Sequence, residues 1–223
     1  MITTFLAQVA TAVEELPVEE GLHMVLKTKF IEGNALFMSL VAMALVLGLA
    51  FCIERIIFLS LSDIDTKSFM QKLRGLCTND KAAAEKLCDD TNGPVAAISR
   101  HALAHAEDAP ADLERNIRSY AEVQVGKLEK GCSWIKLFIA IAPSLGFLGT
   151  VIGMVMAFDQ IQTEGDISPT IVASGMKVAL ITTIFGIIVA VVLQIFYNYI
   201  LSRIEHLTSQ MEQAAIELME ILK

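Results

Sequence analysis

The chain has 223 residues, of which 54% are hydrophobic and 19% are charged, and its mean hydropathy is +0.57. A typical soluble domain carries about 25% charged residues, so an ordinary soluble enzyme, a disordered tail and a disulfide-stapled secreted module are excluded. The formal net charge of −8 argues against nucleic acid as a partner, because a nucleic-acid-binding surface is basic.

Three stretches contain no Asp, Glu, Lys, Arg or His. They are residues 33–53, 137–158 and 178–202, which hold 21, 22 and 25 residues. A helix needs about 20 mostly apolar residues to cross a bilayer. We therefore predict an all-α membrane protein with three transmembrane helices. The predicted division is an N-terminal segment (1–33), a first span (34–56), a helical domain (57–136), a second span (137–158), a short connector (159–177), a third span (178–201) and a C-terminal helix (202–223).

The basic residues suggest an orientation. Residues 54–136 contain twelve Lys or Arg, and the tail begins with Arg203, whereas residues 1–33 contain only Lys27 and Lys29. Basic residues near span ends favour the cytoplasmic side. We expect the 57–136 domain and the C-terminus inside, and the N-terminus and connector outside. Residues 13–32 mix charges with large apolar side chains, so an interfacial helix or a flexible lead-in fits them equally well.

The cytoplasmic segments read as helices. Pro94 and Pro110 stand where helices would begin. From Leu113 to Ile135, apolar residues recur every three to four positions and lead without proline into the second span. This pattern predicts one long helix running into the membrane. A heptad rhythm from Ile200 to Ile221 predicts that the third span likewise continues as a cytoplasmic helix. Packing within one chain and packing between copies explain that rhythm equally well.

Small residues follow one side of the second and third spans. Such residues let membrane helices approach closely, whereas the first span looks bulky on most sides and is expected to face lipid. The predicted helix-packing or partner-facing residues are Gly146, Gly149, Gly153 and Ala157 in the second span, and Ala179, Gly186 and Ala190 in the third, whose stripe of small residues begins at Gly175 just before it.

The three charge-free stretches contain hydroxyls but no carboxylate or histidine. Thr150 lies beside Gly149, and Thr182 and Thr183 lie in the third span. A threonine hydroxyl can donate and accept hydrogen bonds but does not titrate near neutral pH. If this chain lines a proton path, a partner helix must supply the titrating group. The alternative is that each hydroxyl only bonds back to a carbonyl of its own helix.

The strings APSLGFLGTVIGMVMAF and ASGMKVALITTIFGIIVAVVLQIFYN, joined by a short acidic connector, resemble the ExbB/TolQ/MotA proton-channel family. The three-span layout and the large cytoplasmic helical region also resemble its ExbB and TolQ members, the ExbB type most closely. The resemblance implies an inner-membrane motor subunit of bacteria. It implies a homopentamer around a dimer of single-span ExbD- or TolR-type partners, with a TonB- or TolA-type protein carrying the work to the outer membrane.

The resemblance also assigns roles to residues. It places the pore threonines at Thr150 and Thr183, with Thr182 as an additional hydroxyl. Val178 stands where ExbB-type members often have glutamate, so the partner's acid becomes more important. The adjacent Lys177 either reaches the outer interface, as Lys at span ends commonly does, or pairs with a partner carboxylate.

Other constellations are weaker. His101 and His105 share a helix face but lack further metal ligands, so a solvated face is expected. Glu54 and Arg55 read as a local ion pair at the membrane boundary. The four cysteines read as buried core thiols. No catalytic residue, metal or cofactor is predicted, so a membrane enzyme is the least supported class.

Two function classes therefore remain. The first is a proton-driven motor subunit, serving either TonB-type nutrient import or TolQ-type envelope maintenance, and the second is a passive scaffold that docks a partner helix. The two threonines separate these classes, because a scaffold tolerates Thr150→Val and Thr183→Val.

Overall fold

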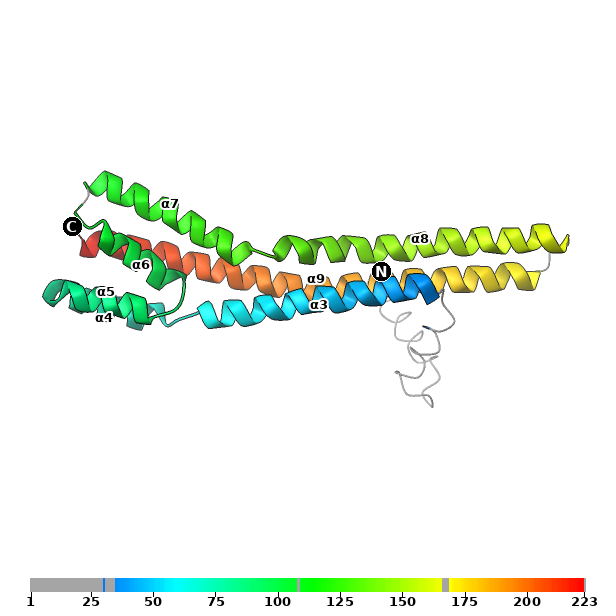
Figure 1. The fold of residues 1–223 in the computed structure, drawn as a ribbon, viewed down its shortest axis with the longest axis horizontal. Coiled ribbons are helices and arrows are strands. Elements are labelled where there is room, and N and C mark those ends of the chain that lie inside the picture. Colours follow the sequence, from blue (N-terminus) through cyan, green and yellow to red (C-terminus); the bar gives the residue numbers. More distant parts are fainter. Residues whose placement is uncertain (1–29, 31–34, 108, 166–168, 223) are drawn as a thin grey trace, which may run out of the picture. The chain divides into compact units, whose positions relative to one another are not determined.

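The computed structural model describes residue 30 and residues 35–107, 109–165 and 169–222. Its elements are α3 (Ala35–Ser62), α4 (Thr66–Asn79), α5 (Lys81–Asp90), α6 (Pro94–Ala104), α7 (Pro110–Glu129), α8 (Cys132–Glu164) and α9 (Pro169–Ile221) (Figure 1). No strand occurs among these described residues. Three helices are long and apolar enough to cross a membrane. The predicted all-α class with three spans is confirmed, and residues 13–29 and 31–32 of the proposed interfacial segment lie outside the described residues.

Local signals fix the starts of the short helices. The Asp80 carboxylate accepts hydrogen bonds from the backbone N–H groups of Ala82 and Ala83 at 3.0 and 3.2 Å, which caps α5. Pro94 and Pro110 occupy the first turns of α6 and α7, as predicted. Proline suits this position because its missing N–H would have no helical partner there.

The prediction of one helix running through residues 113–158 is wrong. α7 ends at Glu129 and α8 begins at Cys132. Gly131 adopts a φ of +87°, a left-handed conformation that ends a helix and that glycine adopts without steric strain. The apolar periodicity continues through the break, so periodicity alone did not reveal it.

The third span does continue as one helix. α9 runs for 53 residues, from Pro169 to Ile221, and its path can be followed from yellow to red in Figure 1. At 1.5 Å per residue this is about 80 Å, far more than the roughly 30 Å of a hydrocarbon core. The heptad positions at Ile200, Ile204, Leu207, Met211, Ala214 and Leu218 are buried.

The chain divides into two compact units. The first comprises residues 1–45 and 140–190, and the second comprises residues 46–139 and 191–223. In the second unit, the Arg203 guanidinium lies 2.9 Å from the Asp63 carboxylate. The Gln210 side chain accepts a hydrogen bond from Thr66 at 3.1 Å. These polar contacts attach α9 to the segment between α3 and α4 and to the first residue of α4.

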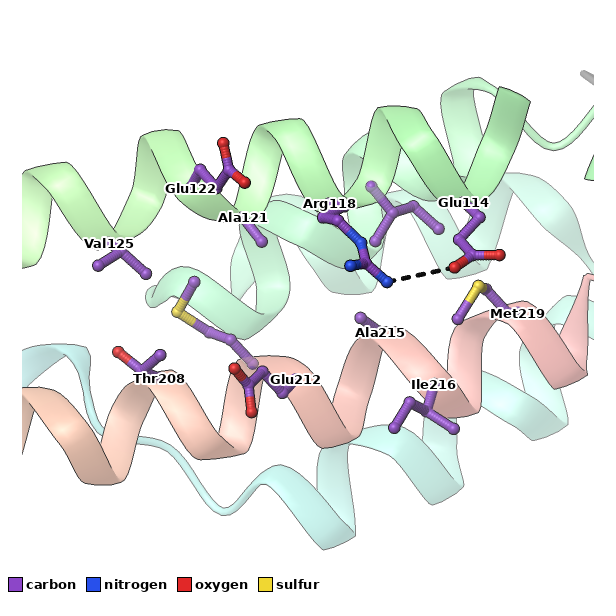
Figure 2. Close-up of a pocket in the computed structure, with 12 residues that line it drawn as sticks. Glu114, Arg118, Ala121, Glu122, Val125, Thr208, Glu212, Ala215, Ile216 and Met219 are labelled. Atoms are coloured by element: carbon purple, nitrogen blue, oxygen red, sulfur yellow. Dashed lines mark hydrogen bonds and ion pairs between the residues drawn. The ribbon is translucent and has the colours of Figure 1, made fainter. Parts of the chain in front are cut away.

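Within the second unit, α7 and α9 enclose a hollow of about 560 Å³ (Figure 2). The apolar side chains of Ala121, Val125 and Ile216 are among its lining residues. Glu114 and Arg118, which also line it, form an ion pair at 3.3 Å on α7. The exposed fraction of Ile216 is 57%. This surface therefore remains open in the single chain.

Other expectations need correction. The first span does carry small buried residues, because Ala44 and Cys52 are buried and a Cβ added to Gly48 would lie 2.6 Å from Leu193. His101 is not on a freely solvated face: its ring stacks on Tyr120, with the ring centroids 4.2 Å apart. The cysteine prediction is confirmed for the buried thiols at positions 52, 88 and 132, whereas Cys77 is half-buried.

Candidate functional site: the contact between α8 and α9

The small residues of α8 and α9 face each other in the first unit. A Cβ added to Gly146 would lie 2.9 Å from the Thr182 carbonyl oxygen and 3.0 Å from the Thr183 Cα. A Cβ added to Gly186 would lie 2.6 Å from the Ala142 carbonyl oxygen. Because these neighbours are backbone atoms, a larger residue would push the helices apart. The glycines thus allow the two backbones to touch.

The same contact extends along both helices. A Cβ added to Gly175 would lie 2.5 Å from the Ala157 Cβ, and one added to Gly153 would lie 3.2 Å from the Ala179 Cβ. Gly146, Gly149, Gly153, Ala157, Ala179 and Gly186 are buried, and Ala190 is half-buried. The structure thus brings the two stripes of small residues together within one chain.

Two hydroxyls meet beside the contact between Gly146 and Thr183. The Thr150 and Thr183 Oγ1 atoms are 3.3 Å apart. The Thr183 hydroxyl also donates to the Gly146 carbonyl oxygen at 3.0 Å, and the Thr150 hydroxyl donates to the Phe147 carbonyl oxygen. Each hydroxyl has a single hydrogen. Either Thr183 donates to Thr150 while Thr150 donates to Phe147, or Thr150 donates to Thr183 while Thr183 donates to Gly146, so the pair has two hydrogen-bonded arrangements.

Thr182 has different surroundings from its neighbour. Its side chain is fully buried, and its hydroxyl donates to the Ala179 carbonyl oxygen of its own helix at 2.7 Å. A Cβ added to Gly149 would lie 2.7 Å from the Thr182 Oγ1. Thr182 therefore packs into the space that Gly149 leaves open. Of the three hydroxyls, only that of Thr183 reaches a carbonyl of the other helix.

The threonine pair borders an open apolar surface. Phe147, Leu180 and Ile187 flank Thr150 and Thr183 at helical spacing, and their exposed fractions are 66%, 57% and 50%. Phe37 of α3 lies on another side of the two helices, because a Cβ added to Gly149 would lie 3.5 Å from the Phe37 Cβ. Phe30 meets Phe185 edge to face, with the ring centroids 6.2 Å apart. The surface around the pair is therefore available to another helix.

The remaining predicted residues lie toward the α8–α9 connector. Lys177 is exposed and borders a shallow hollow with Ala173 and Leu180. Val178 stands at the position where the sequence analysis expects glutamate in similar proteins. It lines a different hollow together with Asp159 and Gln160. The sequence offers no spacing signal for that second hollow, because Asp159 and Val178 belong to different helices.

These features define a multi-pass membrane protein with a hydroxyl pair at a close contact between two spans. The family model described as the MotA/TolQ/ExbB proton channel family matches residues 90–213. This match covers more than half of the chain. The chain therefore belongs to the MotA/TolQ/ExbB proton channel family, which confirms the resemblance read from the sequence.

Individual relatives with ExbB names support the same family assignment. The chain is 35% identical over 112 residues to an ExbB homolog of Methanothermobacter thermautotrophicus, which covers 50% of this chain and 39% of that protein. It is 26% identical over 180 residues to an ExbB-like protein of Synechocystis sp., covering 78% and 70% of the two chains. It is 32% identical over 89 residues to biopolymer transport protein ExbB of Aquifex aeolicus, and the match covers 40% of this chain and 60% of that protein.

Proposed function

We propose that this chain is the ExbB-type subunit of an inner-membrane proton-driven complex. With an ExbD-type partner, it couples the proton-motive force to a TonB-type protein for nutrient import across the outer membrane. The observation that carries this proposal is the Thr150–Thr183 hydroxyl pair at 3.3 Å, placed in spans that contain no Asp, Glu, Lys, Arg or His. Family membership supports the proton-channel part of the proposal.

In this proposal the chain supplies hydrogen-bonding positions and the partner supplies the acid. Residues 137–158 and 178–202 contain no carboxylate and no histidine. Proton relays through membranes commonly use such groups. The partner's carboxylate would lie against the open surface beside Phe147 and Ile187. There the Thr183 hydroxyl, alternating between Gly146 and Thr150, hydrogen-bonds the proton-bearing group as it passes.

Thr182 and Lys177 have supporting roles in the proposed function. The buried Thr182 holds the helix contact that positions Thr183. Lys177 sits near the outer boundary of the third span, where we propose that it pairs with a carboxylate of the partner. Replacing it by glutamine should then weaken co-purification of the partner. Unchanged co-purification would leave Lys177 as a side chain that reaches the interface.

The proposed orientation places residues 57–136 and the C-terminus in the cytoplasm and the N-terminus in the periplasm. Trp134 is half exposed, and the Lys136 ammonium lies 5.4 Å from the centroid of the Tyr197 ring. Aromatic and basic residues of this kind are typical of the membrane–water boundary. A fluorescent protein fused after Lys223 should fluoresce. A periplasm-active phosphatase fused there should be inactive, and the reverse result would overturn the orientation.

The partners proposed for the complex are further copies of this chain, typically five, around a dimer of ExbD- or TolR-type single-span helices. The open surface around Phe147 and Leu180 supports a partner helix in the membrane. The open hollow between α7 and α9 supports contacts between copies. Cross-linking and native mass spectrometry of the complex purified with its partner would give the stoichiometry directly.

The test of this function is energised uptake of an iron chelate in cells whose only copy carries Thr183→Val. The matched control is Thr183→Ser, which keeps the hydroxyl. We expect uptake to be lost with valine and kept with serine, at equal protein levels and with the partner bound. Normal uptake with valine but envelope leakage in the same cells would favour the TolQ-type alternative. No defect in either assay would favour a passive scaffold.

A further inference from the structure

The contact between α8 and α9 widens into a hollow at the end that leads to the connector. This hollow has a volume of about 590 Å³ and lies within the first unit. Asp159 and Gln160 of α8, both exposed, line it. It is therefore reached from outside the single chain. Its remaining lining residues are Gly153, Met156 and Ala157 of α8, and Ser174, Gly175 and Val178 of α9.

The inner end of this hollow comes close to the hydroxyl pair. On α8, Gly153 follows Thr150 by three residues, a rise of about 4.5 Å. On α9, Val178 precedes Thr183 by five residues, a rise of about 7.5 Å. At Gly153 the two helices touch, because a Cβ added there would lie 3.2 Å from the Ala179 Cβ. The hollow thus ends about one to two helical turns short of the hydroxyl pair.

The lining suits a group of water molecules. Asp159 brings a carboxylate, Gln160 an amide and Ser174 a hydroxyl. A water molecule takes up about 30 Å³ in the liquid, and it occupies a cavity where polar groups bind it. The volume of the hollow and its three polar side chains meet both conditions. Water in the hollow would extend from the rim toward the hydroxyl pair.

Asp159 is the one acidic or basic side chain among the described residues that line this hollow. Lys177, which is next to Val178 in sequence, lines a different hollow. A carboxylate can bind a proton and release it, whereas an amide does not titrate in this way. A negative charge at the mouth of a cleft also raises the local concentration of cations. Asp159 therefore combines the position and the chemistry to collect protons.

We propose that this hollow is the outer entrance of the proton path and that the Asp159 carboxylate collects protons there. The carboxylate binds a proton from water on the connector side and releases it to water in the hollow, so Asp159 is unchanged after each transfer. The proton then moves toward Thr150 and Thr183. This inference rests on the proposed function, because it needs a proton path at the hydroxyl pair. It adds an acid that belongs to this chain rather than to its partner.

The test is proton flux through the complex purified with its partner and reconstituted in vesicles, compared at equal partner content. Asp159→Asn keeps the size of the side chain and removes the acid, whereas Asp159→Glu keeps the carboxylate. We expect flux to fall by about tenfold with asparagine and to stay within about twofold of normal with glutamate, because a charged mouth raises arrival rates by about tenfold or more. Equal flux with asparagine and with the unmodified chain would overturn the entrance.

A carboxylate placed elsewhere in the hollow separates this role from a structural one. Val178 lines the hollow from the facing helix, so Val178→Glu added to Asp159→Asn should restore most of the lost flux. Met176→Glu in the same background is the matched control. Met176 lies two residues away on α9 but lines a different hollow, so its substitution should restore nothing. No recovery with Val178→Glu, or equal recovery with Met176→Glu, would also overturn the proposal.

Thr183→Val in the same vesicles keeps this test distinct from the test of the proposed function. If Thr183→Val reduces flux and Asp159→Asn does not, the path at the hydroxyl pair stands and the entrance is wrong. If Thr183→Val leaves flux unchanged, the proposed function fails and the entrance fails with it.

Discussion

Thr182 and Thr183 are adjacent in sequence but have different neighbours in the structure. One residue step on a helix turns the side chain by about 100°. Thr182 therefore packs against Gly149, while Thr183 reaches Gly146 and Thr150. The sequence predicts that both hydroxyls belong to a proton path but cannot separate their roles, because the separation depends on which side of α9 meets α8.

This difference yields a prediction at Thr182. Thr182→Val keeps the shape and removes a hydrogen bond to a carbonyl of its own helix, so we expect a loss of stability of about 0.5–1.5 kcal/mol. Uptake by the energised complex should remain near normal. Thermal unfolding in mild detergent and the iron-chelate assay check the two parts. Loss of uptake with the complex intact would place Thr182 in the proton path and contradict the separation proposed here.

At the element scale, the α8–α9 contact depends on glycine. We expect Gly186→Val to destabilise the protein by about 1–3 kcal/mol, because the first added carbon already lies 2.6 Å from the Ala142 carbonyl oxygen. The midpoint of thermal unfolding measures this loss.

Gly75 in α4 is the matched control for this substitution. A Cβ added there meets nothing within 4 Å, so Gly75→Ala should stabilise α4 by about 0.5–1 kcal/mol. Equal unfolding midpoints for Gly186→Val and the unmodified chain would show that α8 and α9 do not need close approach.

The stack of α6 on α7 should be sensitive to pH. Burial, together with nearby His105, lowers the pKa of His101 below its ordinary value of 6.5. As the pH falls below 6.5, the unfolded chain binds a proton at this position before the folded chain does, so stability decreases. We expect His101→Phe, which keeps an aromatic ring over Tyr120, to lose less stability between pH 7.5 and 5.5. Unfolding midpoints at the two pH values test this, and identical pH dependence in both proteins would contradict it.

The sequence predicted best those elements in which apolar residues recur at the most regular spacing. The spans and the heptad tail follow from hydrophobic spacing, and the two stripes of small residues follow from the requirement that membrane helices approach closely. The break at Gly131 was missed because apolar residues keep their spacing across it. Its signal was present, since a glycine that follows Lys127 and Lys130 is typical of a helix end.

At the scale of the whole molecule, the proposed function gives the chain an incomplete proton path. It supplies hydroxyls and a close helix contact, and its charge-free spans supply no acid. Sequence alone indicated this division of labour with a partner. It could not show that the stripes of small residues meet within one chain, nor that Thr183 reaches the Gly146 carbonyl oxygen, because both depend on contacts between distant segments.

The most direct test of the central claim is proton flux through the complex purified with its partner and reconstituted in vesicles, read by an internal pH-sensitive dye. The three samples are the unmodified chain, Thr183→Ser and Thr183→Val. We expect flux close to normal with serine and reduced by about 10- to 100-fold with valine, because the proposed path loses a hydrogen-bonding position worth about 1–3 kcal/mol. Equal flux in all three samples would show that protons do not pass Thr183.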